Sequence, residues 1–101
     1  MRISTTQQSQ ICQTIHQLLG KEVTIRVFGS RLHDNARGGD LDLLIQTHHA
    51  LEQPALLSSR IAARVSRLLH GRKVDVLLQA PNLKTTPVHY IAQQQGQLIH
   101  A

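Results

Sequence analysis

A polar, glycine-containing segment between two strand-like stretches constrains the fold of this chain more than any other feature. Apolar residues alternate with other residues over Val23–Phe28, and this period of two predicts a strand. The segment DLDLLIQ at residues 40–46 alternates in the same way and predicts a second strand. Residues 29–39 must then connect two consecutive strands, and glycines at both ends of this segment allow the tight turns required.

Three helices and one further strand complete the predicted elements. Apolar residues at helical spacing predict one helix between the Ser4–Thr5–Thr6 cluster and Gly20, and another from Pro54 to Gly71. Residues 73–79, KVDVLLQ, predict a third strand. Thr86 followed by Pro87 predicts the start of a last helix, which ends before Gly96. The order helix, strand, strand, helix, strand, helix indicates one α/β unit.

Length and charge limit the function classes. The chain has 101 residues, which is enough for a single domain, residues 1–101, but not for a separate substrate-binding domain. Eleven Lys and Arg residues against six acidic ones give a net charge of +5, so polyanions are expected to be attracted. The aromatic residues are Phe28 and Tyr90, too few for a surface that stacks single-stranded bases.

The single cysteine, Cys12, excludes an intramolecular disulfide and suits a reducing cytoplasm. Cys12 and His16 have the spacing of half a zinc site, but no second pair follows, so zinc is not expected. Neither an apolar run of about 18 residues nor a signal-peptide pattern is present, so neither membrane insertion nor secretion is expected.

Two carboxylates on the second predicted strand suggest a metal site. Side chains alternate along a strand, so Asp40 and Asp42 point to the same side, about 6.5 to 7 Å apart. Such a pair is repulsive unless a cation lies between the carboxylates. Mg²⁺ fits, because it prefers oxygen ligands and is usually bound by one or two carboxylates plus substrate phosphates. The alternative is a solvated strand face.

The turn before this strand carries groups that bind phosphate. Gly29 lets the backbone approach a phosphate closely, and Ser30 contributes a hydroxyl and a backbone N–H. Arg31 and Arg37 are candidate phosphate ligands, because a guanidinium group matches phosphate in a bidentate fashion. By itself a Gly-Ser pair is only a turn. Followed by the Asp40-x-Asp42 strand, it predicts a site for a nucleoside triphosphate with a divalent metal.

A third carboxylate and a group of arginines are further candidate functional residues. Asp75 lies in the middle of the third predicted strand, and on a neighbouring strand it would complete a three-carboxylate cluster. Alone, it would be an ordinary charge on an exposed strand face. Arg60, Arg64 and Arg67 lie mostly off the apolar stripe of their helix and read as a solvated basic face, with a nucleic-acid or acidic-partner surface as the less favoured alternative.

Together, Gly29-Ser30, Asp40-x-Asp42 and Asp75 resemble the signature of the polymerase-β-like nucleotidyltransferase superfamily. The small size is similar to that of its minimal nucleotidyltransferase members, and the resemblance covers nearly the whole chain. It implies the fold of that superfamily, a small mixed β-sheet with helices packed on one side.

The resemblance also implies an activity. Family members bind a triphosphate, usually ATP, with two Mg²⁺ ions and transfer the nucleoside monophosphate to a hydroxyl. By match, Asp40 and Asp42 hold the metals, Asp75 helps to activate the acceptor, and Gly29 with Ser30 grips the phosphates. Many minimal members resemble the antitoxin half of a two-gene module and adenylylate a tyrosine of a helical HEPN toxin, the expected partner here.

The sequence departs from the family pattern in the turn. Nine residues separate Ser30 from Asp40, one fewer than in many small members, and Gly39 replaces the serine usual before the first aspartate. This departure bears on catalytic rate more than on nucleotide binding. Two alternatives stay open: a nucleotide-binding antitoxin that neutralises its partner by contact alone, and a nucleotidyltransferase that acts on RNA or a small molecule.

Overall fold

The computed structural model of the chain describes residues 3–29 and 41–100. Every helix and strand predicted above is present, with bounds that differ from the predictions by about three residues at most. A short last strand is additional, because two residues are too few to show a period in the sequence. In chain order the elements are α1 (Thr5–Leu19), β1 (Val23–Phe28), β2 (Leu41–Thr47), α2 (Pro54–Leu68), β3 (Val74–Gln79), α3 (Pro87–Gln95) and β4 (Gln97–Leu98).

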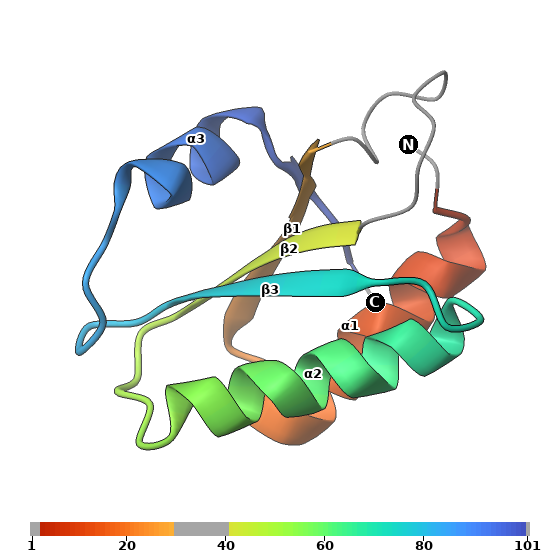
Figure 1. Cartoon of the computed structure of the whole chain (residues 1–101), viewed down its shortest axis with the longest axis horizontal. Coiled ribbons are helices and arrows are strands. Elements are labelled where there is room, and N and C mark those ends of the chain that lie inside the picture. Colours follow the sequence, from red (N-terminus) through yellow and green to blue (C-terminus); the bar gives the residue numbers. More distant parts are fainter. Residues whose placement is uncertain (1–2, 30–40, 101) are drawn as a thin grey trace.

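The strands form one mixed sheet in the order β3-β2-β1-β4. β1 runs antiparallel to β2, which runs parallel to β3 (Figure 1). The parallel pair needs a crossover connection, and α2 supplies it. The predicted α/β class and mixed sheet are confirmed.

Helices cover both faces of this sheet. α1 and α2 lie together on one face, as expected, whereas α3 lies over part of the opposite face (Figure 1). The reason is that each face of β2 carries at least one apolar side chain that must be covered. Leu41, Leu43 and Ile45 are fully buried toward α1 and α2, and Leu44, which points the other way, is fully buried as well. α3 contributes the buried Ala92 to the cover of this second face.

The main core lies between the sheet and the α1–α2 layer. The fully buried side chains of this core include Ile11, Ile15, Ile61, Val65, Val27 and Leu43.

The start of α1 is fixed by a capping box. The Ser4 hydroxyl accepts from the Gln7 N–H, and the Gln7 side chain accepts from the Ser4 N–H, both at 3.0 Å. In the described part of the chain, no helix is long and apolar enough to cross a bilayer.

A buried histidine ties α3 to the sheet. Nδ1 of His89 accepts a hydrogen bond from the Thr86 N–H at 3.0 Å, so the ring proton sits on Nε2. Nε2 lies 3.0 Å from the Leu78 carbonyl oxygen, to which it donates. The sequence assigns no role to His89. In the structure it satisfies the first turn of α3 and links that turn to β3.

We expect His89→Ala to lower the free energy of unfolding by about 1–3 kcal/mol, because it leaves buried hydrogen-bonding groups without a partner. The matched control is Tyr90→Ala, one residue along the same helix, where the side chain is 59% exposed. This control should change stability by less than about 0.5 kcal/mol. Urea unfolding followed by circular dichroism measures both, and equal losses would contradict the anchoring role of His89.

Candidate functional site

Two of the three predicted carboxylates, Asp42 and Asp75, lie at one end of the sheet, on the face that carries α3. In the strand register, Asp42 on β2 pairs with Phe28 on β1 and with Asp75 on β3. Residues paired in this way share a face, and their Cα atoms lie about 4.8 Å apart. Asp42 and Asp75 are therefore direct neighbours, as the sequence required for a shared site.

Both carboxylates are accessible from outside. Asp42 is half-buried, and Asp75 is exposed on β3, an outer strand of the sheet. Neighbouring carboxylates favour a bound cation, which relieves the repulsion between them. The pair thus has the donor type and the access that a magnesium ion requires.

Gly29, directly after β1, lies against Asp42. Its φ of +79° is in the left-handed region, and a Cβ built on it would collide with the Asp42 carboxylate oxygen. The Cγ of Asp42 would lie 3.2 Å from that Cβ. The space that a side chain would fill at residue 29 is thus taken by the Asp42 carboxylate, so the first residue of the predicted turn lies against a predicted metal ligand.

The other predicted site residues, Ser30, Arg31, Arg37 and Asp40, lie outside the described residues. Within residues 3–29 and 41–100, no three His, Cys, Asp or Glu side chains are grouped closely enough to hold a metal ion. Asp42 and Asp75 therefore supply two carboxylates, and the predicted third, Asp40, is adjacent in sequence to the described start of β2. Its contribution stays a prediction.

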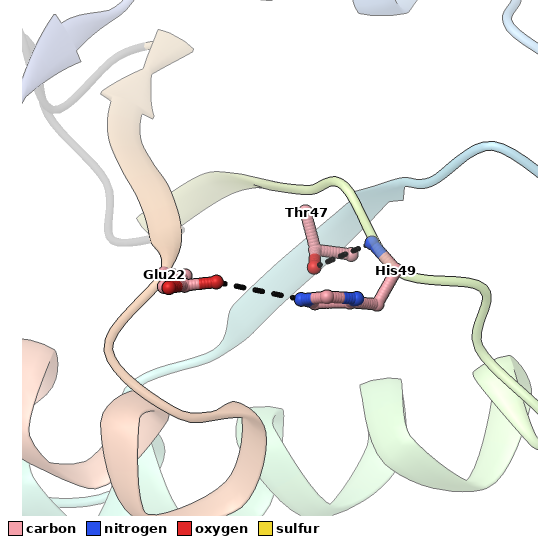
Figure 2. A network of polar contacts seen from close by, with 3 residues as sticks. All are labelled: Glu22, Thr47 and His49. Atoms are coloured by element: carbon pink, nitrogen blue, oxygen red, sulfur yellow. Dashed lines mark hydrogen bonds and ion pairs between the residues drawn. The ribbon is translucent and has the colours of Figure 1, made fainter.

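A pocket of about 520 Å³ opens at the opposite end of the sheet. At its edge, Nε2 of His49 lies 3.5 Å from Oε2 of Glu22, and the His49 N–H donates to the Thr47 hydroxyl at 3.3 Å (Figure 2). The lining is mainly polar: Glu22, Thr24, Arg26, Gln46, Thr47, His48, Gln79, Ala80, Pro81, Leu83 and Thr85.

A chain of hydrogen bonds crosses three strands beside this pocket. Nε of Arg26 donates to Gln46 at 3.3 Å, and the Gln46 amide donates to Gln79 at 3.3 Å. Gln93 of α3 also donates to Gln79, at 2.8 Å. This network holds α3 against the sheet at the end remote from Asp42.

The sequence pattern gives no sign of this hydrogen-bond network. Strand alternation places Arg26 on the same face as Phe28, and Gln46 on the same face as Asp42, so their face could be predicted. Their contacts depend on strand register, which the spacing of residues along the sequence does not report.

Cys12, one half of the Cys12–His16 pair that has zinc-ligand spacing, is buried, and this burial raises the pKa of its thiol.

Comparison with known proteins leaves the family of the chain open. No protein-family model matches it, and no curated protein matches it at a significant level.

The geometry predicts that Gly29→Ala displaces the Asp42 carboxylate. The new Cβ would occupy the position of a flexible side-chain oxygen, so Asp42 must rotate away. Adding a Cβ at positive φ costs about 1 kcal/mol or more by itself. We therefore expect a modest loss of stability and a larger loss of Mg²⁺ affinity, at least about tenfold, measured by isothermal titration calorimetry in the presence of ATP.

The control for this substitution is Gly20→Ala. Gly20 has a similar φ of +85° but nothing within 4 Å of an added Cβ, so it reproduces the backbone strain without the collision. If both variants lose Mg²⁺ affinity equally, the contact between Gly29 and Asp42 has no part in metal binding.

Proposed function

We propose that this chain is a Mg²⁺-dependent nucleotidyltransferase that transfers AMP from ATP to a hydroxyl group of a partner protein. The observation that carries the proposal is the register pairing of Asp42 with Asp75, together with the approach of Gly29 to Asp42. Gly29, the first residue of the proposed phosphate-binding turn, thereby adjoins the carboxylate of Asp42, which neighbours Asp75. This is the arrangement that binding a triphosphate with its metal requires.

The residues present fit magnesium. Asp42 and Asp75 would hold the ions together with Asp40, and the two ions expected by resemblance would neutralise charge on the attacking and leaving oxygens. One carboxylate oxygen of Asp42, Oδ2, lies in the space that a side chain on residue 29 would fill. The absence of a side chain at Gly29 therefore keeps Asp42 in its position on the sheet.

The turn after β1 would bind the triphosphate. Gly29 offers a bare backbone, and we assign Ser30, Arg31 and Arg37 to the phosphate oxygens on the grounds of their chemistry. The net charge of +5 favours the approach of a nucleotide, since association with a polyanion is faster at a positively charged surface.

In the proposed reaction, the acceptor hydroxyl oxygen forms a bond to the α-phosphorus of ATP. The bond between the α-phosphorus and the oxygen that bridges to the β-phosphate breaks, and pyrophosphate leaves. The hydroxyl proton passes to a carboxylate. We assign this role to Asp75, because it is exposed on an outer strand, where an incoming hydroxyl has access.

The acceptor is proposed to belong to another protein. By the resemblance described above, this partner is a helical HEPN toxin, the acceptor is one of its tyrosines, and the chain acts as its antitoxin in the cytoplasm. Neutralisation by contact alone is the alternative, in which nucleotide binds but no AMP is transferred. Transfer to RNA or to a small molecule is the other.

Magnesium with ATP is expected to stabilise the protein. At one hundred times the dissociation constant, a ligand specific for the folded state adds about 2.7 kcal/mol, or about 10 °C in Tm for a domain of this size. Asp42→Asn should abolish this shift. Glu52→Gln, which removes an exposed carboxylate beyond the other end of β2, should retain it. Differential scanning fluorimetry gives the result, and equal shifts in all three proteins would exclude a metal site at Asp42.

AMP transfer is tested with ATP labelled at either the α- or the γ-phosphate. Incubation with Mg²⁺ and a co-purifying helical protein should put α-label, but not γ-label, on that protein, because pyrophosphate leaves. Asp42→Asn and Asp75→Asn should each lower incorporation by at least about a hundredfold, as expected for groups essential to the reaction.

The other outcomes distinguish the alternatives. A stable complex without α-label would favour neutralisation by contact, and α-label on RNA or a small molecule would favour another acceptor.

Asp75 also places a charge on an outer strand, where charges prevent edge-to-edge association. If Asp75→Asn forms oligomers by light scattering but transfers AMP normally, Asp75 serves solubility and not the reaction.

A further inference from the structure

The α1–α2 layer contains no acidic residue. Neither the sequence of α1, TTQQSQICQTIHQLL, nor that of α2, PALLSSRIAARVSRL, includes Asp or Glu. No acidic residue occurs anywhere between Glu52 and Asp75, a stretch that holds five of the 11 Lys and Arg residues. No carboxylate on either helix neutralises the positive charge here, and the nearest described acidic residue in the sequence, Glu52, precedes α2 and lines a hollow together with Arg60.

Three arginines of α2 form a compact cationic surface, which we call the arginine flank: Arg60, Arg64 and Arg67. All three side chains are exposed. At 3.6 residues per turn they lie within about 60° of one another around the helix axis and span about 10.5 Å along it. None of them forms an ion pair with another residue in the described parts of the chain.

The surroundings of the arginine flank favour phosphate over an acidic protein as its partner. A protein interface usually has an apolar or aromatic core. The exposed neighbours here are small, such as Ser59 and Ala63, and Leu56 is the one large apolar side chain of α2 that is exposed. A surface of this kind attracts a polyanion by charge and offers it little else.

The geometry also favours a duplex. Single-strand binding depends on aromatic side chains that stack on bases, and the described part of α2 has none. A duplex presents its phosphates in rows on a stiff backbone, which guanidinium groups on one helix flank can contact together. The spacing of the arginines, about 4.5 to 6 Å along the axis, is close to that of successive phosphates.

We propose that the arginine flank of α2 binds the phosphate backbone of duplex nucleic acid without reading its sequence. α2 lies on the face of the sheet opposite to α3 (Figure 1). Strand alternation and register place Asp42 and Asp75 on the face that carries α3. The two surfaces are thus separated by the sheet. This proposal is independent of the nucleotidyltransferase activity proposed above.

The test is fluorescence anisotropy of labelled, mixed-sequence 20-base-pair DNA and RNA duplexes, titrated with the full chain at several salt concentrations. Arg60→Gln with Arg64→Gln should weaken binding at least tenfold. It should also reduce the slope of log K against log salt by about 1.8 on DNA, since each phosphate contact contributes about 0.9. The duplex that binds more tightly identifies the nucleic acid preferred.

Two double variants serve as controls. Lys21→Gln with Lys84→Gln lowers the net charge by the same amount at exposed positions outside α2, and it should bind nearly as wild type does. Arg60→Lys with Arg64→Lys preserves charge and should retain most of the salt slope. Circular dichroism of each variant verifies that α2 is intact.

Specific results would overturn the proposal. Equal weakening in the Gln variants of α2 and in the Lys21–Lys84 pair would show that net charge alone attracts nucleic acid. Competition by polyglutamate at the same concentration of charge as the duplex would assign the arginine flank to an acidic protein. Asp42→Asn should leave duplex binding unweakened, so loss of transferase activity and loss of duplex binding are separable.

Discussion

The pairing of β2 with a strand on each side is the constraint on which the rest of the structure depends. β2 is antiparallel to β1 and parallel to β3, so the chain needs a connection after β1 and a helical crossover before β3. Leu41, Leu43 and Ile45 hold this strand in place by burial against α1 and α2. A slip of one residue would turn these three side chains to the wrong face. The same slip would turn Asp42 into the core.

Burial therefore fixes the register, and the register brings the carboxylates together. Asp42 lies between two buried neighbours in sequence, and on β3 the buried Val74 and the partly buried Val76 flank Asp75. Hydrophobic side chains on one face thus determine where charged side chains lie on the other. The two aspartates take no position in the main core, because their side chains face away from the α1–α2 layer.

The elements could be predicted from the sequence because their signals are local. Ser4 and Gly20 bound α1, and the period of apolar residues separates helix from strand. The site could be predicted only in part. That Asp42 and Asp75 are direct neighbours depends on the register between β2 and β3, which local patterns do not report. The burial of His89 and the position of α3 over Leu44 depend on tertiary contacts, and a polar residue in a short helix gives no sign of them.

The sheet also separates the charges of the molecule. The carboxylates Asp42 and Asp75 share one face, whereas the exposed arginines Arg60, Arg64 and Arg67 belong to the helix on the other. Charges on the same face would attract and neutralise each other over distances shorter than about 8 Å, the screening length at physiological salt. A layer of buried leucine and isoleucine lies between the carboxylates and the arginines. The proposed cation site and the proposed polyanion surface would therefore lie on opposite sides of one small domain.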